Sequence, residues 1–440
     1  MSEYIPFLLF GLVFLLILIG YPVAFTLAGV SIIAGLLYFD VDFFYLLSLR
    51  IYGTMSNFVL MAVPLFVFMG IMLEKSGLAE NLLDTMAMLF GKLKGGLAIS
   101  VVIVGGMLAA STGIVGATVI TMGMISLPTM LKRGYKTELA TGVIASSGTL
   151  GQIIPPSVVL VLLGSVLNVS VGDLFTAAIV PGVVLVMLYL VYIVIVAAVK
   201  PEIAPCIPAE ERKDFWANGA TKKIVIAFVF PFLLILVVLG SIFAGIASPT
   251  EAAAVGAIGS IILTVIQKKF NLKILKEVMK DTTFLTCMVF VILIGATSFS
   301  LVFRGMGGDR LLSEIITSAN LSPYVFLAFV LGVVFIAGFF IDFIEIIFII
   351  VPVAAPIFAA LGIDLIWVGI LIALNLQTSF LTPPFGFSLF YLKGVAPPEV
   401  STRQLYRGII PFVGIQLLLL ILVIAFPELV SFLPELMAKN

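Results

Sequence analysis

The sequence predicts an all-α, multi-pass membrane protein built from two repeats of opposite topology. Three observations lead to this fold class. Of the 440 residues, 62% are hydrophobic and only 10% are charged, with a mean hydropathy of +1.30. Apolar runs of about 18 residues or more, the length that crosses a bilayer, recur from end to end. Two double prolines interrupt apolar runs at corresponding places in the two halves of the chain.

Apolar segments alternate with polar loops along the whole chain. They fall at residues 5–19, 23–38, 57–74, 96–131, 138–167, 174–199, 224–243, 250–266, 282–303, 323–361, 365–392 and 408–426. Segments 96–131 and 323–361 are long enough for two short arms but tight for two full spans of about 20 residues each. We therefore expect each of these two segments to form a re-entrant hairpin.

Basic residues predict the orientation of the chain in the membrane. Lys92 and Lys94 precede the first hairpin segment, and Lys132 and Arg133 follow it. Because basic loops face the cytoplasm, both ends of this hairpin are expected inside, which gives an external N-terminus. The same reasoning places 19 of the 23 basic residues inside (23 − 4). The four expected outside are Arg50, Arg304, Arg310 and Lys439.

The polar stretch 200–223 divides the chain into two halves with similar patterns. The double prolines end at Pro156 and Pro384, which are 228 residues apart (384 − 156), and Pro128 and Pro356 have the same spacing. Because the halves start on opposite sides of the membrane, they form inverted repeats, which are typical of secondary transporters. The predicted division is a first repeat over 1–199, a cytoplasmic linker over 200–223 and a second repeat over 224–440.

Each double proline predicts a helix that is broken inside the bilayer, the first within 138–167 and the second within 365–392. Pro156 cannot donate a backbone hydrogen bond, and Pro155 is pushed out of the α region by the proline that follows it. Backbone carbonyls left unpaired in lipid are costly. A hard cation such as sodium can satisfy them, because it prefers oxygen ligands and the nearby half-helix end carries partial negative charge.

Four polar stretches supply further oxygen atoms near the tips and the breaks. They are residues 109–118, 146–157, 337–345 and 375–386. Any one hydroxyl in them has a simpler reading, which is packing between helices or bonding back to its own helix. Asp342 and Glu345 lie in the second hairpin. They could be cation ligands or proton carriers, or they could lie at a hairpin tip that reaches water at the interface.

Other features bound the function or predict local structure. The chain has no histidine, which excludes His-based catalysis and His metal sites, and its two cysteines lack the spacing of a disulfide or metal framework. We therefore do not expect an enzyme, and the zero net charge gives no sign of nucleic-acid binding. The stretch "SPTE" from Ser248 predicts a capping box, and the amphipathic stretch 78–96 predicts an arm along the cytoplasmic interface.

Several motifs carry a resemblance to a known family. "SGTLGQIIPPSVVLVLLGSVLNVSVGDLFTAAIVPG", "ASPTEAAAVGA", "GFFIDFIEIIFIIVPVAAPIF" and "FLTPPFGFSLFYLKGVAP" resemble the large membrane subunit of the tripartite ATP-independent periplasmic (TRAP) transporters. The similarity covers essentially the whole chain. It implies sodium-driven import of an organic acid across the bacterial inner membrane by an elevator fold. It also implies two partners, a periplasmic binding protein and a separate four-helix membrane subunit.

The resemblance also implies where ions and substrate bind. One sodium site would use Ser111, Thr112, Gly148, Gly151, Ile154 and Pro155. A second sodium site would use Gly338, Asp342, Thr378, Thr382 and Pro383. Substrate contacts are expected between the tips and the breaks, at Gly113, Gly116, Ser147, Asn375 and Gln377. The first tip reads "ASTGIVGAT", which departs from the family's commoner Gly-Ser-Ser pattern and leaves its side-chain ligands open.

Two alternative functions stay open at this point. The first is a stand-alone ion-coupled anion transporter of similar inverted-repeat architecture, which would need no binding protein. The second is a passive channel, which saturable kinetics and counterflow would exclude.

Overall fold

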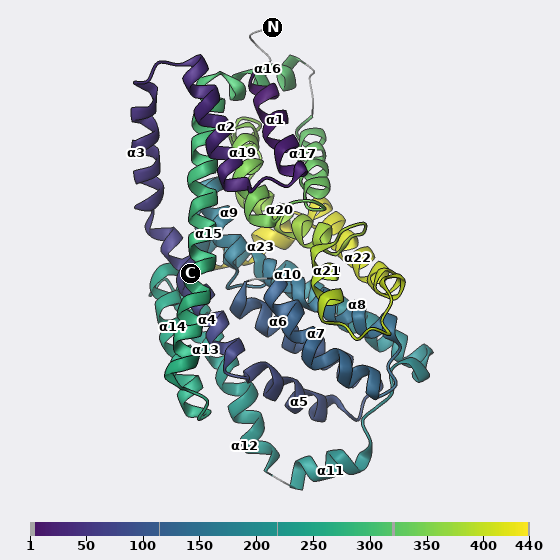
Figure 1. Cartoon of the computed structure of the whole chain (residues 1–440). Coiled ribbons are helices and arrows are strands. Elements are labelled where there is room, and N and C mark those ends of the chain that lie inside the picture. The colour runs from purple at the N-terminus through teal and green to yellow at the C-terminus, as the bar shows by residue number, and fades with distance from the viewer. Residues whose placement is uncertain (1–4, 114, 218, 319–321, 439–440) are drawn as a thin grey trace.

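The computed structural model describes residues 5–113, 115–217, 219–318 and 322–438, and this part of the chain is helical with no strand. The molecule is elongated (Figure 1). The N-terminus lies at one end of the long axis, and the segment that joins the two halves of the chain lies at the other. We call these the N-terminal end and the linker end.

The first half of the chain forms ten α-helices and two short 3₁₀ turns among the described residues. They are α1 (Ile5–Ile19), α2 (Val23–Tyr38), α3 (Phe43–Met55), η2 (Phe58–Met61), α4 (Ala62–Lys75), α5 (Leu78–Phe90), α6 (Gly96–Thr112), α7 (Val115–Lys132), α8 (Thr137–Thr149), η3 (Leu150–Gln152), α9 (Val158–Leu167) and α10 (Val171–Val199). The linker carries η4 (Pro201–Ile203), α11 (Ala209–Ala217) and α12 (Ala220–Ile224).

The second half of the chain is also helical in the described residues. It forms η5 (Val225–Val229, a π-helical turn), α13 (Phe230–Phe243), α14 (Pro249–Ile266), α15 (Leu272–Gly305), α16 (Gly308–Ser318), α17 (Pro323–Ala337), α18 (Phe343–Ile349), α19 (Val351–Ala360), α20 (Leu365–Leu381), α21 (Phe387–Val395), α22 (Thr402–Ala425) and α23 (Glu428–Ala438). Seven helical segments in the described residues are long and apolar enough to cross a membrane. The pair α18 and α19, bent by 49°, forms a further span or a re-entrant loop. The protein is therefore a multi-pass membrane protein.

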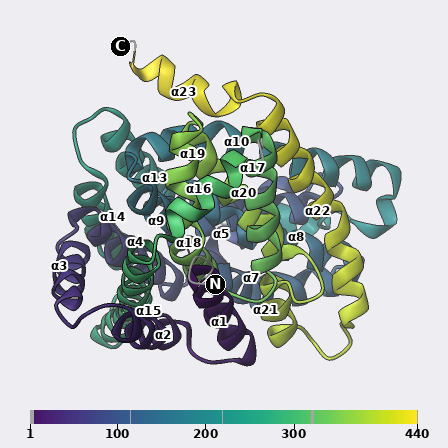
Figure 2. The ribbon, with the colours of Figure 1, turned by 90° about the horizontal axis from the view of Figure 1, so that it is seen from above.

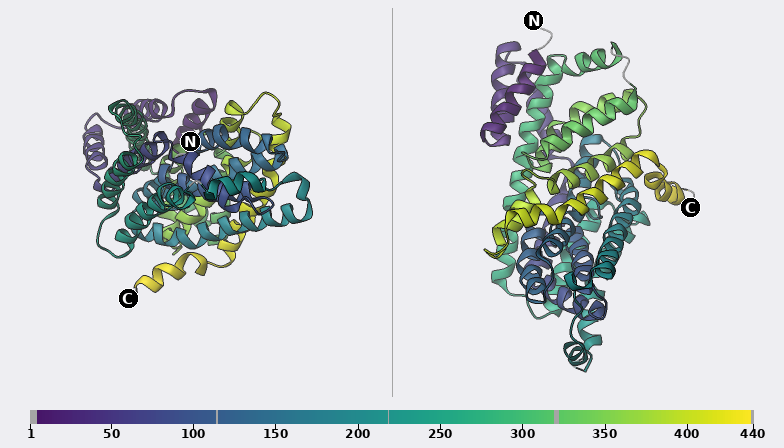
Figure 3. Two further views of the ribbon diagram at one scale, coloured as in Figure 1. Left: turned by 90° about the horizontal axis from the view of Figure 1, so that it is seen from below. Right: turned by 90° about the vertical axis from the view of Figure 1, so that its right-hand side faces the viewer.

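The helices fall into two groups (Figure 2). In the lateral group, α15 packs on α2, α3 and α4, and α14 packs on α4 and α13. The central group contains the two hairpin segments and the interrupted helices α8–α9 and α20–α21, with α10 and α22. Helix α22 crosses the central group obliquely and leads to α23 at the rim (Figure 3).

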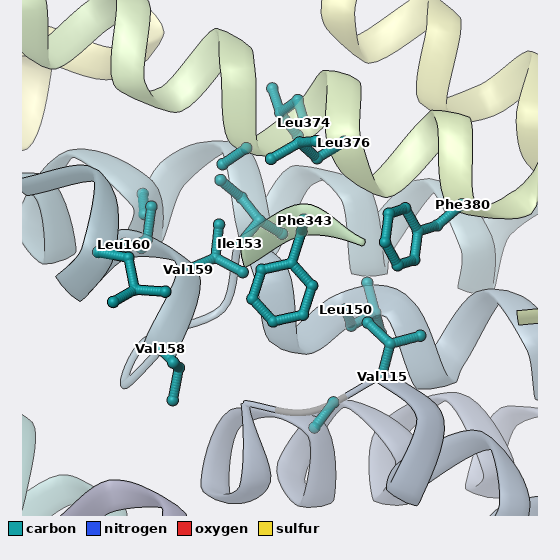
Figure 4. Close-up of a cluster of buried hydrophobic side chains, with 14 of the residues drawn as sticks. Val115, Leu150, Ile153, Val158, Val159, Leu160, Phe343, Leu374, Leu376 and Phe380 are labelled. Atoms are coloured by element: carbon teal, nitrogen blue, oxygen red, sulfur yellow. The ribbon is translucent and has the colours of Figure 1, made fainter. Parts of the chain in front are cut away.

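The interrupted helices form the core. Every residue of α20 from Trp367 to Leu381 is buried, and so is every residue of α8 from Leu139 to Thr149. Figure 4 shows Leu150 and Ile153 of the first break against Leu374, Leu376 and Phe380 of α20. Apolar packing from both halves therefore surrounds the polar breaks, which fixes their backbone in place.

Four helices were not expected from the sequence: α3, α11, α16 and α23. Helix α3 has only 13 residues, and Arg50 interrupts its apolar sequence, so it lacks the long apolar run that the sequence analysis relied on. None of its residues is buried. Helices α16 and α23 are strongly amphipathic and short, which hides them from the same criterion. The predicted capping box is confirmed, because the Ser248 hydroxyl accepts from the Glu251 N–H and the Glu251 carboxylate accepts from the Ser248 N–H.

Candidate functional site

The first break leaves main-chain oxygens without partners. Helix α8 ends at Thr149, and α9 begins at Val158, where the Ser157 hydroxyl accepts from the Leu160 N–H and donates to the Gln152 carbonyl. The Ile154 N–H donates to the Leu150 carbonyl at 2.9 Å. The carbonyls of Ile154 and Pro155 accept no hydrogen bond from the described residues. Both atoms are therefore available to a ligand.

The tip of the first hairpin presses against this break through glycines. Gly113 closes α6 with a φ of 62°, and a Cβ on it would lie 2.7 Å from Cγ2 of Val158. A Cβ on Gly151 would lie 2.3 Å from the Ala109 carbonyl oxygen of α6. These approaches are possible only for glycine, because a methyl group would collide with the opposite backbone or side chain. The tip and the break are thus held in backbone contact.

The remaining residues predicted for the first ion site lie along the same interface. Gly148 faces α7, where its missing Cβ would come within 2.3 Å of Cγ2 of Val119. Ser111 and Thr112 form the last turn of α6, next to Gly113. Their side chains lie outside the described residues, so their part in an ion site stays a prediction.

The second break is partly closed by side chains. Helix α20 ends at Leu381. The Thr382 hydroxyl donates to the Thr378 carbonyl at 2.7 Å, and the Tyr406 hydroxyl donates to the Pro384 carbonyl at 2.7 Å. The Pro383 carbonyl accepts no hydrogen bond from the described residues. Side-chain hydroxyls therefore satisfy two of the carbonyls at the second break.

The two predicted threonine ligands at this break bond back to their own helix. Thr378 donates to the Leu374 carbonyl at 2.8 Å, as Thr382 does to that of Thr378. Such bonding was the simpler alternative for each hydroxyl. It uses the hydroxyl proton and leaves the oxygen lone pairs able to contact a cation.

The tip of the second hairpin joins α17 to α18 through Gly338 and Asp342. A Cβ on Gly338 would lie 2.1 Å from the Ser379 hydroxyl oxygen, so the backbone of this tip packs against a side chain of α20. Asp342 is the N-cap of α18, where its carboxylate accepts from the Phe343 N–H at 2.8 Å. The Glu345 carboxylate accepts from the Asp342 N–H at 3.2 Å. The two acidic residues thus form a capping box, a role that the sequence analysis did not assign to them.

The residues predicted to bind substrate lie on several elements, and their joint role stays a prediction. Gly113 and Gly116 lie at the first tip, with Gly116 against the ring of Tyr391 in α21. Ser147 is buried and donates to the Ile144 carbonyl of its own helix. Asn375 is buried and donates to the Leu331 carbonyl of α17 at 2.7 Å. The two glycines border a tip, whereas the two polar side chains are already engaged inside the core.

Gln377 connects the two interrupted helices. Its Nε2 donates to the Thr149 hydroxyl at 3.3 Å, and the two residues are 228 positions apart. The Gln377 Oε1 and both polar atoms of the Gln152 side chain are buried without a hydrogen-bond partner in the described residues. A buried polar group left unpaired costs about 1–3 kcal/mol. Sequence reasoning missed Thr149 and Gln152, although the spacing of 228 pairs Thr149 directly with Gln377.

A polar cavity of about 600 Å³ lies beside this core, between the lateral and central groups. Its walls come from α3, η2, α9, α15, α18 and α19, and none of the predicted substrate residues lines it. The described residues contain no group of three or more histidine, cysteine or acidic side chains that could hold a metal ion. The polar groups at the tips and breaks are main-chain oxygens, hydroxyls and amides, together with the Asp342 and Glu345 carboxylates at the second tip.

Interrupted helices that meet re-entrant hairpins in a buried core define a helical membrane transporter. Residues 10–429 match the family model described as "Tripartite ATP-independent periplasmic transporter, DctM component". The chain belongs to this family, the large membrane subunits of TRAP transporters, as the resemblance implied.

Individual relatives support this assignment. The chain is 34% identical to the C4-dicarboxylate TRAP transporter large permease protein DctM of Pseudomonas aeruginosa, over 92% of this chain and 93% of that one. It is 29% identical to the ectoine TRAP transporter large permease protein TeaC of Halomonas elongata, over 96% and 97%. These relatives are transporter permeases, not enzymes. The YdaH transporter of Alcanivorax borkumensis shares the fold, with a TM-score of 0.64 and 15% identity over 96% of this chain and 98% of that chain.

Proposed function

We propose that this chain is the membrane-spanning large subunit of a sodium-driven TRAP transporter that imports an organic acid anion. The observation that carries the sodium coupling is the pair of unpaired carbonyls, Ile154 and Pro155, in a break that the first hairpin tip contacts through Gly113 and Gly151. A monovalent cation supplies the charge that such oxygens lack, at a place where α8 also ends in partial negative charge.

In this proposal, sodium closes each tip onto its neighbouring break and completes an anion site between them. Two sodium ions and a substrate of one negative charge carry one net positive charge inward. A membrane potential of ~100 mV then contributes about 2.3 kcal/mol per cycle. A tenfold sodium gradient adds about 1.4 kcal/mol for each ion. The central group would move against the lateral group as an elevator.

The proposal includes the membrane, the orientation and two partners. The chain would reside in the bacterial inner membrane with its N-terminal end outside, as the distribution of basic residues predicts. A periplasmic binding protein would deliver the substrate, and a small four-helix membrane subunit would accompany the chain. The relatives named above carry a C4-dicarboxylate and ectoine, so a panel that includes succinate and ectoine is the natural starting set of substrates.

Uptake by proteoliposomes tests the proposal. The chain is reconstituted with its small subunit, and labelled substrates are supplied with or without a binding protein. We expect accumulation only with external sodium and, for a substrate of one negative charge, faster accumulation when the interior is negative. Equal accumulation when potassium replaces sodium would contradict the sodium coupling. Full activity without any binding protein would instead favour a stand-alone anion transporter, the alternative that shares this architecture.

A further inference from the structure

The cavity between the two helix groups contains only positive charge. Two arginines line it, Arg50 from α3 and Arg304 from the last turn of α15. No aspartate or glutamate is among its lining residues. A guanidinium group stays positively charged and binds a carboxylate through its N–H donors. Two arginines without a carboxylate therefore make this cavity suited to an anion.

The remaining polar wall of the cavity is uncharged. Asn57 donates to the Ser165 hydroxyl at 3.2 Å, and the Thr54 and Thr297 hydroxyls lie 3.4 Å apart. Amide and hydroxyl groups of this kind can donate to a carboxylate. The cavity thus combines two guanidinium groups with neutral hydrogen-bonding groups, as sites for small organic anions commonly do.

Arg304 links the lateral group to the second hairpin for a specific reason. Its Nη2 donates to the Pro352 carbonyl at 3.2 Å. In a helix this carbonyl would accept from the residue four positions later, but that residue is Pro356, which has no N–H. A guanidinium has five N–H donors, so one bond to the carbonyl leaves others for a ligand.

Arg50 has no such structural duty. In the described part of the chain it forms no hydrogen bond and no ion pair, although it lines the same cavity. Arginine is the side chain that best binds a carboxylate, because its planar fork matches the two oxygens. Arg50 is therefore the freer of the two groups to bind a ligand.

The position of the cavity relates it to the tips. Helix α9 begins at Val158 against the first tip, and Ser165 of the cavity wall follows seven residues later, about 10 Å along the helix. Helix α18 begins beside Asp342, and Phe348 of the cavity wall lies about 8 Å along it. The cavity thus lies about one helix length from both tips, toward the N-terminal end where α15 finishes (Figure 1).

We propose that this cavity is an entry subsite, in which Arg50 and Arg304 bind the carboxylate of the transported organic acid before it reaches the hairpin tips. The inference rests on the proposed function and deepens it, because it names the groups that receive the substrate. It requires that the substrate carry a carboxylate and arrive from the N-terminal end.

Thiol labelling measures the charge of the cavity without requiring transport. Cys206 and Cys287 are replaced by serine, and Ser300→Cys places one thiol on the cavity wall, one helical turn from Arg304. The rate of modification is compared for an anionic sulfonatoethyl and a cationic trimethylammonioethyl methanethiosulfonate. We expect Arg50→Gln to lower the anionic-to-cationic rate ratio about fivefold, as removal of one nearby charge should.

A matched control removes the same charge at the same end of the molecule. Arg310→Gln lies on exposed α16, where Arg310 pairs with Glu314 at 3.3 Å and does not line the cavity. It should leave the ratio unchanged. Arg304→Lys, which keeps the charge but loses the fork, should preserve the ratio. A ratio unaffected by Arg50→Gln would overturn the inference. Because Arg50 has no hydrogen-bond or ion-pair partner among the described residues, a folding defect would not explain that result.

Substrate kinetics separate this inference from the proposed function. For the transported acid, Arg50→Gln should raise the KM about tenfold with little change in maximal rate, the loss expected for one charged hydrogen bond. Succinate, if transported, should slow labelling of the Ser300→Cys thiol in the parent protein and not in the Arg50→Gln variant. Normal sodium-driven uptake with an unchanged KM would overturn the entry subsite alone. Absence of sodium-driven uptake in the parent protein would overturn the proposed function itself.

Discussion

The two double-proline breaks share a sequence pattern but are built from different materials. At the first break the contacts are between backbones, with Gly113 and Gly151 allowing the hairpin tip to touch the broken helix. At the second break, the hydroxyl groups of Thr382 and Tyr406 donate to the carbonyls of Thr378 and Pro384. If both breaks hold sodium, the first depends on the absence of side chains and the second on their oxygens.

The largest expected effect comes from adding one methyl group at the first break. In Gly151→Ala the new Cβ would lie 2.3 Å from the Ala109 carbonyl oxygen, and backbone cannot move aside cheaply. Such overpacking costs about 1–3 kcal/mol or more, so we expect loss of at least about 90% of sodium-driven uptake at equal protein level. Uptake and thermal unfolding of the purified complex measure the effect.

The comparison sharpens with two further variants. Gly338→Ala would collide with the Ser379 side chain, 2.1 Å from its Oγ and 2.7 Å from its Cβ, and not with backbone, so its loss should be smaller and should be rescued by adding Ser379→Gly. Gly394→Ala in α21, where nothing lies within 4 Å, is the control and should behave as the parent. An equal loss for all three variants would show that the first break has no special need for glycine.

The next largest effect is expected where the two breaks are joined. Thr149→Val keeps the side-chain shape but removes the acceptor of the Gln377 Nε2, which is buried. Leaving that donor unpaired should destabilise the protein by about 1–3 kcal/mol. Thermal unfolding of the complex in detergent measures this, with Thr283→Val as an exposed control whose hydroxyl bonds only to its own helix. An unaltered unfolding temperature would contradict the contact.

A moderate effect is expected at the second break alone. Thr382→Val removes a hydroxyl oxygen predicted as a sodium ligand while leaving the first break intact. We expect the sodium concentration for half-maximal uptake to rise about tenfold, the equivalent of about 1.4 kcal/mol. Uptake measured over a sodium series gives this value, and Thr382→Ser should retain the parent value. Identical sodium curves for the valine variant would remove Thr382 from the site.

The smallest effect is expected at Tyr406. Tyr406→Phe frees the Pro384 carbonyl by removing its hydroxyl partner, which should cost about 1 kcal/mol of stability. Because this makes the second break more like the first, sodium dependence should change little. Parallel unfolding and uptake measurements check both statements, and a large shift in sodium affinity would mean that this carbonyl belongs to the ion site.

Much of this architecture could be predicted from the sequence, because long apolar runs and paired prolines have direct structural meaning. The helix α15 illustrates the limit. It runs unbroken for 34 residues, whereas the positions 228 earlier are divided into α3, η2 and α4. Helix α16 lies 228 residues after the positions of the amphipathic helix α5, so a comparison of the two halves would have predicted it. Boundaries of the repeats at 199 and 224 stay a prediction.

Site details were less predictable because they depend on tertiary packing. Asp342 and Glu345 follow the same four-residue capping pattern as Ser248 and Glu251, but their apolar neighbours suggested an ion ligand instead. Arg50 and Arg304 were both expected outside, yet no sequence pattern indicates that they share one cavity. That cavity exists because α3 stands away from the central group, a feature of packing between distant segments.

The bond between Thr149 and Gln377 has a consequence for how the protein responds to ions. The same position of each half meets its own counterpart, so the pseudo-two-fold axis of an inverted repeat would pass between these two side chains. A movement of one half caused by a bound cation is then passed directly to the other half through this hydrogen bond. We expect the first ion to ease entry of the second, giving sigmoidal activation by sodium.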